Sequence, residues 1–445
     1  MPPRSSDRLA VVSALRGVAM AGLFALLAGC GTPSAPPTPS PAQTAASTAS
    51  SATVAGNPDR APAVDSVLRR LAAALRDHDA AGFTALVSER DPGFADNAKM
   101  IFTNLGRLSP TVLQLTATGK TEPLSKQRAA VLGSDAYAAE VTVRWQVNGD
   151  RSPSDLTVWM TFGTDRSGSG LRWAGNVDGP GGKRPTPLWW LEPIRVDHDQ
   201  HATVIAGPDV AAADWLERAD GAIRDVKAQA ASAPDGPWRS WNHRLVLVIP
   251  SSEDRLEQML GVADGAESAL AAVTWPDGSR AGRAPIRIMI NSGSPQPDLG
   301  ARIVLTHETV HVATASPTSP APTWLIEGFA DYVAYRSYPR AQQAAAGALL
   351  QQVSRSGPPQ QLPTDKDFTG SGEELDLAYA KSWLACHYLA RTYGTDALFS
   401  FYAAVDRSTA GEIGPASRTA FGIDEDQLLT GWRSYLSDAA RQGRI

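Results

Sequence analysis

Along the first half of the chain, apolar side chains are spaced first as in helices and then as in strands. From Val64 to Leu75 they recur every three or four positions, which predicts an amphipathic helix over 63–77. A second, shorter helix is expected over 80–87. Beyond it the period changes to two, which is typical of strands that bury one face. The strands expected on this pattern cover 112–118, 141–147, 156–162 and 171–174.

The residues between the two middle strands favour a tight hairpin. Asn148, Gly149 and Asp150 are of the types that accept the backbone conformations of such a turn. Helices followed by a curled antiparallel sheet resemble the cone-shaped fold of nuclear-transport-factor-2-like domains. The resemblance implies an α+β domain over 60–195 with a curved antiparallel sheet, in which we see no catalytic constellation.

The pattern changes again after residue 196. A helix is expected over 211–230. Three uninterrupted apolar runs then predict strands of a small sheet, over 244–250, 269–275 and 286–291. Helical patterns follow, including one over 377–393. We therefore predict an α+β fold, in which 196–445 forms a second domain with a small sheet followed by a mainly helical part.

The first 59 residues are predicted to be a secretory targeting signal followed by a tether. Three arginines precede an apolar run that is short for a membrane span, which is typical of a secretory signal over 1–29. Residues 27–30, Leu-Ala-Gly-Cys, resemble the bacterial lipobox, which implies cleavage before Cys30 and lipid attachment to it. An ordinary secretory signal with a chance cysteine is the alternative. Residues 30–59 are rich in Pro, Ser, Thr and Ala and cannot bury enough apolar surface to fold. We therefore expect a lipid-anchored protein on the extracytoplasmic side of the cell membrane.

Composition and charge narrow the classes of function. The 445 residues hold 41 Lys and Arg against 46 Asp and Glu, and the formal net charge of −5 argues against a nucleic-acid partner. Cys30 and Cys386 are the two cysteines, so a disulfide scaffold and a cysteine-built metal site are excluded. We expect a monomer.

One segment of the second domain carries candidate chemistry. Residues 305–311 read Leu-Thr-His-Glu-Thr-Val-His and contain the pattern His-Glu-x-x-His. On a helix, His307 and His311 lie one turn apart on the same face and can reach one ion. Glu308, beside the first histidine, can take a proton from a water on that ion. Valine and threonine are frequent around the motif, so propensity alone also allows a strand, and a chance match on a surface helix is a further alternative.

A catalytic zinc site needs a third protein ligand and an open fourth position. Glu327 lies 16 residues after His311, on a helix expected to begin near residue 323. Asp331 is four residues farther along and lies on the same helical face.

This layout resembles the gluzincin metallopeptidases, the group of thermolysin and aminopeptidase N. The zinc ligands that the resemblance implies are His307, His311 and Glu327. Glu308 would be the general base. Asp331 would orient a ligand histidine, in the first place His307.

A later stretch offers a candidate for stabilising the reaction's oxyanion. Tyr379, Lys381 and Ser382 resemble the Tyr-x-Lys-Gly stretch of aminopeptidase-like gluzincins, in which the tyrosine donates a hydrogen bond to the oxyanion. A tyrosine that caps a core helix is the alternative for Tyr379, and His387 and Tyr388 are competing donors. The strand expected over 286–291 lacks the Gly-x-Met-x-Asn pattern that binds a substrate's free amine in that group. Whether the enzyme is an endopeptidase or an exopeptidase therefore stays open.

Together these features predict a zinc-dependent metallopeptidase that hydrolyses peptide or protein substrates at the outer face of a bacterial membrane. Two alternatives remain open on the sequence. The protein is a non-catalytic binding lipoprotein of the cell surface, or it is a zinc hydrolase of a non-peptide substrate.

Overall fold

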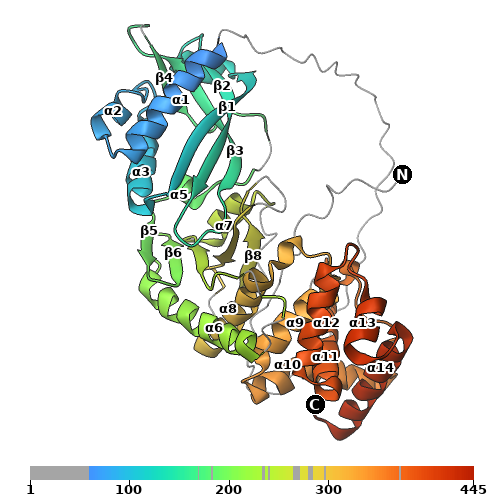
Figure 1. Cartoon of the computed structure of the whole chain (residues 1–445). Coiled ribbons are helices and arrows are strands. Elements are labelled where there is room, and N and C mark those ends of the chain that lie inside the picture. Colours follow the sequence, from blue (N-terminus) through green and yellow to red (C-terminus); the bar gives the residue numbers. More distant parts are fainter. Residues whose placement is uncertain are drawn as a thin grey trace, which may run out of the picture.

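The structure is a computed structural model whose fold is α+β, as the sequence predicts (Figure 1). The residues that it describes are 60–445 apart from 169, 182–183, 233–235, 239–240, 264–270, 279–283, 295–296 and 370–371. The predicted signal segment, Cys30 and the tether lie outside the described residues. Within them, no helix is both long and apolar enough to cross a membrane.

The first part of the molecule is an antiparallel sheet of four strands, in the order β1-β2-β3-β4, packed against helices. Its elements are α1 (Arg60–Arg76), α2 (Ala80–Thr84), α3 (Pro92–Leu108), β1 (Val112–Pro123), α4 (Lys126–Leu132), β2 (Tyr137–Gln146), β3 (Ser154–Thr164), β4 (Leu171–Gly175) and α5 (Leu188–Leu191). The predicted hairpin joins β2 to β3, and the Asp150 carboxylate accepts a hydrogen bond from Val147 N at 2.9 Å. The helix expected over 80–87 ends at Thr84, and α3 was not predicted.

The second sheet is mixed, in the order β5-β6-β7-β9-β8. Its strands and their two helices are β5 (Arg195–His198), β6 (Ala202–Ala206), α6 (Ala212–Ser232), β7 (Leu245–Ile249), α7 (Glu253–Leu260), β8 (Ala272–Pro276) and β9 (Ile286–Ile290). The strands β6, β7 and β9 run parallel, while β5 and β8 pair antiparallel with their neighbours. In the described part of the chain, β8 is therefore an edge of this sheet.

Both faces of the second sheet are buried, because the first part of the molecule packs on one face and the helices that follow the sheet pack on the other. Leu247 and Ile288 face the core that contains α6 and the helices after the sheet. Val246, Val248 and Met289 face the core of the first part instead. This double burial explains why the strands read as uninterrupted apolar runs rather than as alternating ones.

A buried arginine on β9 links the first part of the molecule to the second sheet. Arg287 of β9 is fully buried, and its guanidinium lies 3.9 Å from the ring centre of Trp145 on β2. Its Nη2 donates to Asp150 Oδ2 at 2.6 Å, and its Nη1 donates to Asp277, just beyond β8. Burial raises the pKa of Asp277, although the charge of Arg287 acts against that shift. A buried cation needs such partners because an unpaired charge away from water is very costly.

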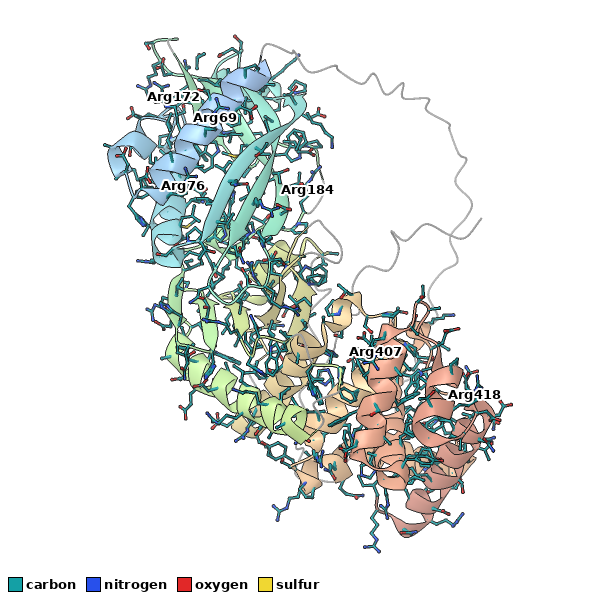
Figure 2. All side chains as sticks on the ribbon, in the orientation of Figure 1. Arg69, Arg76, Arg172, Arg184, Arg407 and Arg418 are labelled. Atoms are coloured by element: carbon teal, nitrogen blue, oxygen red, sulfur yellow. The ribbon has the colours of Figure 1, made fainter. Side chains whose placement is uncertain are left out.

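The remainder of the chain is helical, as predicted, and forms the far end of the molecule in Figure 1. Its elements are α8 (Asp298–Thr314), η1 (Ser316–Thr318), α9 (Thr323–Tyr335), α10 (Pro339–Ser356), η2 (Asp365–Phe368), α11 (Glu373–Tyr393), α12 (Thr395–Arg407), α13 (Ile413–Phe421) and α14 (Glu425–Gln442). Figure 2 places Arg69 and Arg76 on the first part of the molecule and Arg407 and Arg418 on this helical end.

Candidate metal centre

The His-Glu-x-x-His segment lies on α8, a helix enclosed by other elements. The helix packs against α6 on one side, α9 on another and the β8 edge of the second sheet on a third. Residues 303–314 are all buried. Packing on every side outweighs the weak helix propensity of the valines and threonines in this segment. The alternative of a strand at this position is therefore excluded.

The neighbouring helix α9 supplies the candidate third ligand. It begins after Pro322, and its first residue, Thr323, donates through its hydroxyl to Asp365 of η2 at 2.7 Å. Glu327 and Asp331 follow one turn apart, and both are buried on the side that meets α8. The hydrogen bond to Asp365 thus holds the first turn of α9 in place, close to the carboxylate of Glu327.

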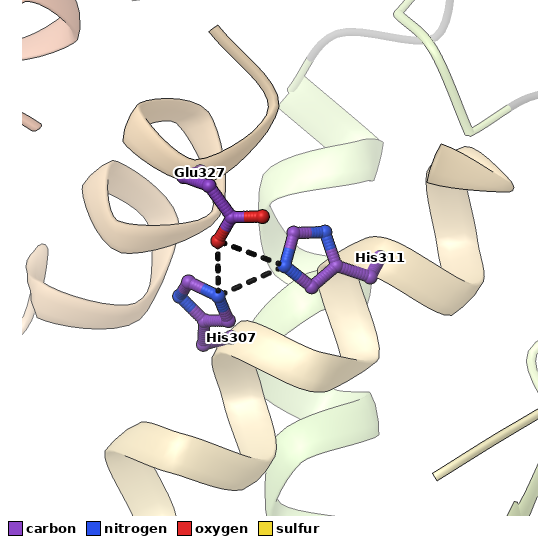
Figure 3. Close-up of side chains that lie close together, drawn as sticks. All are labelled: His307, His311 and Glu327. Atoms are coloured by element: carbon purple, nitrogen blue, oxygen red, sulfur yellow. Dashed lines mark hydrogen bonds and ion pairs between the residues drawn. The ribbon is translucent and has the colours of Figure 1, made fainter. Parts of the chain in front are cut away.

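Three donor atoms converge between the two helices, as Figure 3 shows. The Nε2 atoms of His307 and His311 are 2.9 Å apart. Glu327 Oε2 lies 3.2 Å from Nε2 of His307 and 3.5 Å from Nε2 of His311. Ligands about 2.0–2.2 Å from a tetrahedral zinc are roughly 3.3 Å from one another, so this donor set fits a zinc ion in both spacing and chemistry.

The outer nitrogens of both histidines are also engaged. Nδ1 of His307 lies 2.9 Å from Asp331 Oδ1, so the ring donates to this carboxylate. Nδ1 of His311 lies 2.9 Å from Ser316 Oγ, a hydroxyl that can accept a hydrogen bond from it. With a metal bound, a proton on each Nδ1 would leave each Nε2 with a lone pair for the shared centre. Asp331 lies where the sequence predicted it, whereas Ser316 was not predicted.

Ser316 reaches its histidine because the chain reverses sharply at the end of α8. Ala315 adopts the left-handed conformation with φ of 54°, and the next residue begins η1. Such a residue ends a helix and turns the following side chain back toward its last turn. A serine just beyond the end of the motif helix was the available sequence signal, but its direction depends on that one backbone angle.

Without a metal, the ionisable groups of the centre shift one another strongly. Burial acts to lower the pKa of His307, but hydrogen bonds with Asp331 and Glu327 outweigh it and raise the pKa to about 10. Burial acts to raise the pKa of Glu327, but the charge of His311 and a hydrogen bond with His307 lower it to about 2. The centre is therefore held together as an ion pair, which an incoming cation would replace by releasing a proton.

Glu308, which follows His307 on α8, contacts the edge strand β8. Its side chain is fully buried, and Oε2 accepts a hydrogen bond from Thr274 Oγ1 at 2.5 Å. Among the described residues, its other carboxylate oxygen, Oε1, has no hydrogen-bond partner. Burial raises the pKa of Glu308, against the charges of His307 and His311. A buried carboxyl with a raised pKa and one unoccupied oxygen is suited to accepting a proton.

The three candidate oxyanion donors, Tyr379, His387 and Tyr388, lie on α11, which packs along α9. Tyr379 is buried, and its ring lies 5.5 Å from that of Phe368 on η2. His387 lies two turns farther along, and its Nδ1 is 2.8 Å from Tyr435 Oη on α14. Burial lowers the pKa of His387 to about 4, so this ring is neutral near pH 7. The role predicted for Tyr379 stays a prediction.

The comparison with protein families agrees with the peptidase interpretation. Residues 271–438 match the Peptidase MA superfamily. This part of the chain contains β8, the three candidate ligands and α11, and the match supports a peptidase. The comparison with curated proteins gives no match.

Among solved structures, the chain is similar to a mutant M1 zinc metallopeptidase from Deinococcus radiodurans, solved with a bound Tyr-Ser-Ala substrate. The identity is 15% and the TM-score is 0.30, over 73% of this chain. The aligned region covers 61% of that structure. A TM-score this low does not establish a common fold.

Proposed function

We propose that the protein is a zinc-dependent metallopeptidase of the gluzincin type. The observation that carries the proposal is the convergence of His307, His311 and Glu327 at distances that suit one zinc ion. Glu308 lies beside this cluster with Oε1 unoccupied, within a segment that matches a peptidase superfamily. Three protein ligands leave a fourth position open, which distinguishes a catalytic zinc site from a structural one.

Zinc bound here would act as a Lewis acid that acidifies water and polarises a carbonyl group. Glu308 would accept the proton of the attacking water at Oε1 and later deliver it to the leaving amine. Asp331 and Ser316 would hold the two imidazole rings in their ligating orientation. Tyr379 would donate a hydrogen bond to the oxyanion.

The position of β8 favours a peptide as the substrate. This strand lies at the edge of the second sheet in the described part of the chain, and Thr274 on it touches Glu308. The edge strand of a sheet can pair with an extended peptide backbone through main-chain hydrogen bonds. A peptide bound in this way would run past the proposed general base.

The remaining elements of the proposal rest on the sequence. Lipid on Cys30 would anchor the enzyme to the extracytoplasmic side of the cell membrane, and residues 30–59 would serve as its tether. The enzyme would act as a monomer.

The test is to measure zinc content and peptide hydrolysis with the purified protein. We expect about one zinc per chain, and we expect its loss in His311→Ala. Glu308→Gln should retain the zinc but lose hydrolysis of a peptide library. His198→Ala, which removes an exposed histidine on β5, is the matched control and should change neither quantity.

Two results would refute the proposal. Absence of bound metal, even after zinc is added back, would leave a binding lipoprotein as the better interpretation. Bound zinc together with hydrolysis of esters or amides but of no peptide would indicate a non-peptide hydrolase.

A further inference from the structure

Thr274 occupies an unusual position for a hydroxyl-bearing side chain. It lies in the middle of β8, pairs with Ile288 of β9 and is almost fully buried. Ala272, two residues earlier on the same face, belongs to the core around α8, whereas Val273 faces the core of the first part. The side chain of Thr274 therefore enters the sheet–helix interface where apolar residues would be expected.

The hydroxyl of Thr274 contacts two acceptors of the same residue. Its Oγ1 lies 2.5 Å from Glu308 Oε2 and 3.2 Å from the Glu308 carbonyl oxygen. A hydroxyl has one proton to donate, and the shorter of its two contacts is the stronger hydrogen bond. The 2.5 Å contact therefore assigns the proton to Oε2.

This bond leaves the two oxygens of Glu308 in different situations. Oε2 is fixed by Thr274, whereas Oε1 has no hydrogen-bond partner among the described residues. A carboxylate that turns freely about its last bond would present either oxygen to a substrate water. A carboxylate held at one oxygen presents only the other.

The strand that carries Thr274 is itself braced. The χ1 angle of Thr274 has few allowed values, because a β-branched side chain is stiff at χ1. Just beyond the end of β8, Asp277 pairs with Arg287, which also binds Asp150 of the first part. The position of the hydroxyl is thus set by the sheet and by the interface between the two parts of the molecule.

We propose that Thr274 is a positioning residue, which holds Oε2 of Glu308 so that Oε1 is the oxygen that accepts the proton. This inference rests on the proposed peptidase function. Thr274 acts through Glu308 and contributes nothing to zinc binding.

The experiment compares kcat, KM and zinc content for Thr274→Val, which keeps the shape but removes the hydroxyl, with Thr274→Ser, which restores it. We expect Thr274→Val to lower kcat at least about 10-fold with KM and zinc content unchanged. Thr274→Ser should recover kcat to within about 3-fold of the unmodified protein. Thr203→Val, on β6 of the same sheet, is the matched control, because it removes a hydroxyl that donates to the carbonyl oxygen of Asn148 in the hairpin of the first part. It should leave kcat unchanged.

Two further measurements separate positioning from a general loss of structure. In the Glu308→Gln background, adding Thr274→Val should change the residual kcat by less than about 2-fold, because the group that Thr274 orients is no longer a base. In urea unfolding of the metal-free protein, the two substitutions should be non-additive, which tests the contact without any catalytic readout.

The outcomes separate this inference from the proposed function. An active protein in which Thr274→Val keeps its kcat, or in which Thr274→Ser is no better than Thr274→Val, overturns the role of Thr274 alone. Additive effects in the unfolding cycle also overturn it. A protein that binds no zinc and cleaves no peptide overturns both.

Discussion

Replacing Gly328 by alanine tests whether a close helix crossing fixes the third ligand. Gly328 follows Glu327 on α9, where α9 packs directly on α11. A Cβ atom added there would lie 2.2 Å from the carbonyl oxygen of Ser382 and 3.1 Å from Sγ of Cys386. The first contact is with backbone, so a rotamer change cannot relieve it and one helix must move.

The expected magnitude follows from two opposing terms. Overpacking a dense core typically costs about 1–3 kcal/mol. Alanine is favoured over glycine in a helix by about 1 kcal/mol, which offsets part of that cost. Gly347 on α10 provides the matched control, because a Cβ atom there meets nothing within 4 Å. The free energy of unfolding should therefore be about 1–3 kcal/mol lower in Gly328→Ala than in Gly347→Ala.

The same displacement should weaken metal binding. Movement of α9 carries the Glu327 carboxylate away from the histidines, and we expect zinc affinity to fall at least about 10-fold, as when groups that support metal ligands are removed. Urea denaturation of the metal-free protein measures the first effect, and competition with a chromophoric chelator measures the second. If Gly328→Ala matches Gly347→Ala in both assays, the crossing has room to spare and does not fix the ligand.

Three other substitutions test separate parts of the structure. Ser316→Ala removes the hydroxyl that contacts Nδ1 of His311. Zinc affinity, measured by chelator competition, should fall about 10-fold. Unchanged affinity would mean that packing alone orients the His311 ring. Arg287→Met leaves two carboxylates without their buried cation, so urea denaturation should show a loss of about 3–5 kcal/mol; a loss below about 1 kcal/mol would contradict the role of this pair. Burial holds the pKa of His387 at about 4, below the 6.5 of an exposed histidine, so the unfolded chain binds this proton more tightly. The resulting stability is fully present above pH 6.5 and is lost as the pH falls toward 4, and His387→Gln should flatten this dependence in denaturation of the metal-free protein between pH 7 and pH 4. If stability falls with pH in parallel for the variant and the unmodified protein, His387 does not contribute to this pH dependence.

Much of the candidate centre could be predicted because its signals are local. His307 and His311 are related by one helical turn, and so are Glu327 and Asp331, so their shared faces follow from helix geometry alone. Two helices joined by a short loop also tend to pack on each other, which brings the two pairs together.

Other features of the centre depend on contacts that local patterns do not record. The bond between Thr274 and Glu308 joins residues 34 positions apart and exists because a sheet edge docks on a helix. Ser316 reaches His311 through a single left-handed residue, which nothing in the composition of that loop specifies. The helix α3 does have a local signal, because Asp91 caps it and Pro92 begins it.

The second sheet, which both parts of the molecule cover, has a consequence for how the chain folds. The first part is complete in sequence by about residue 194, but Val246, Val248 and Met289, which close its interior, are translated later. Until β7 and β9 pack against the first part, its apolar surface, which includes Trp189, is exposed to its surroundings. At this stage of folding, chaperone capture or self-association competes with completing the fold.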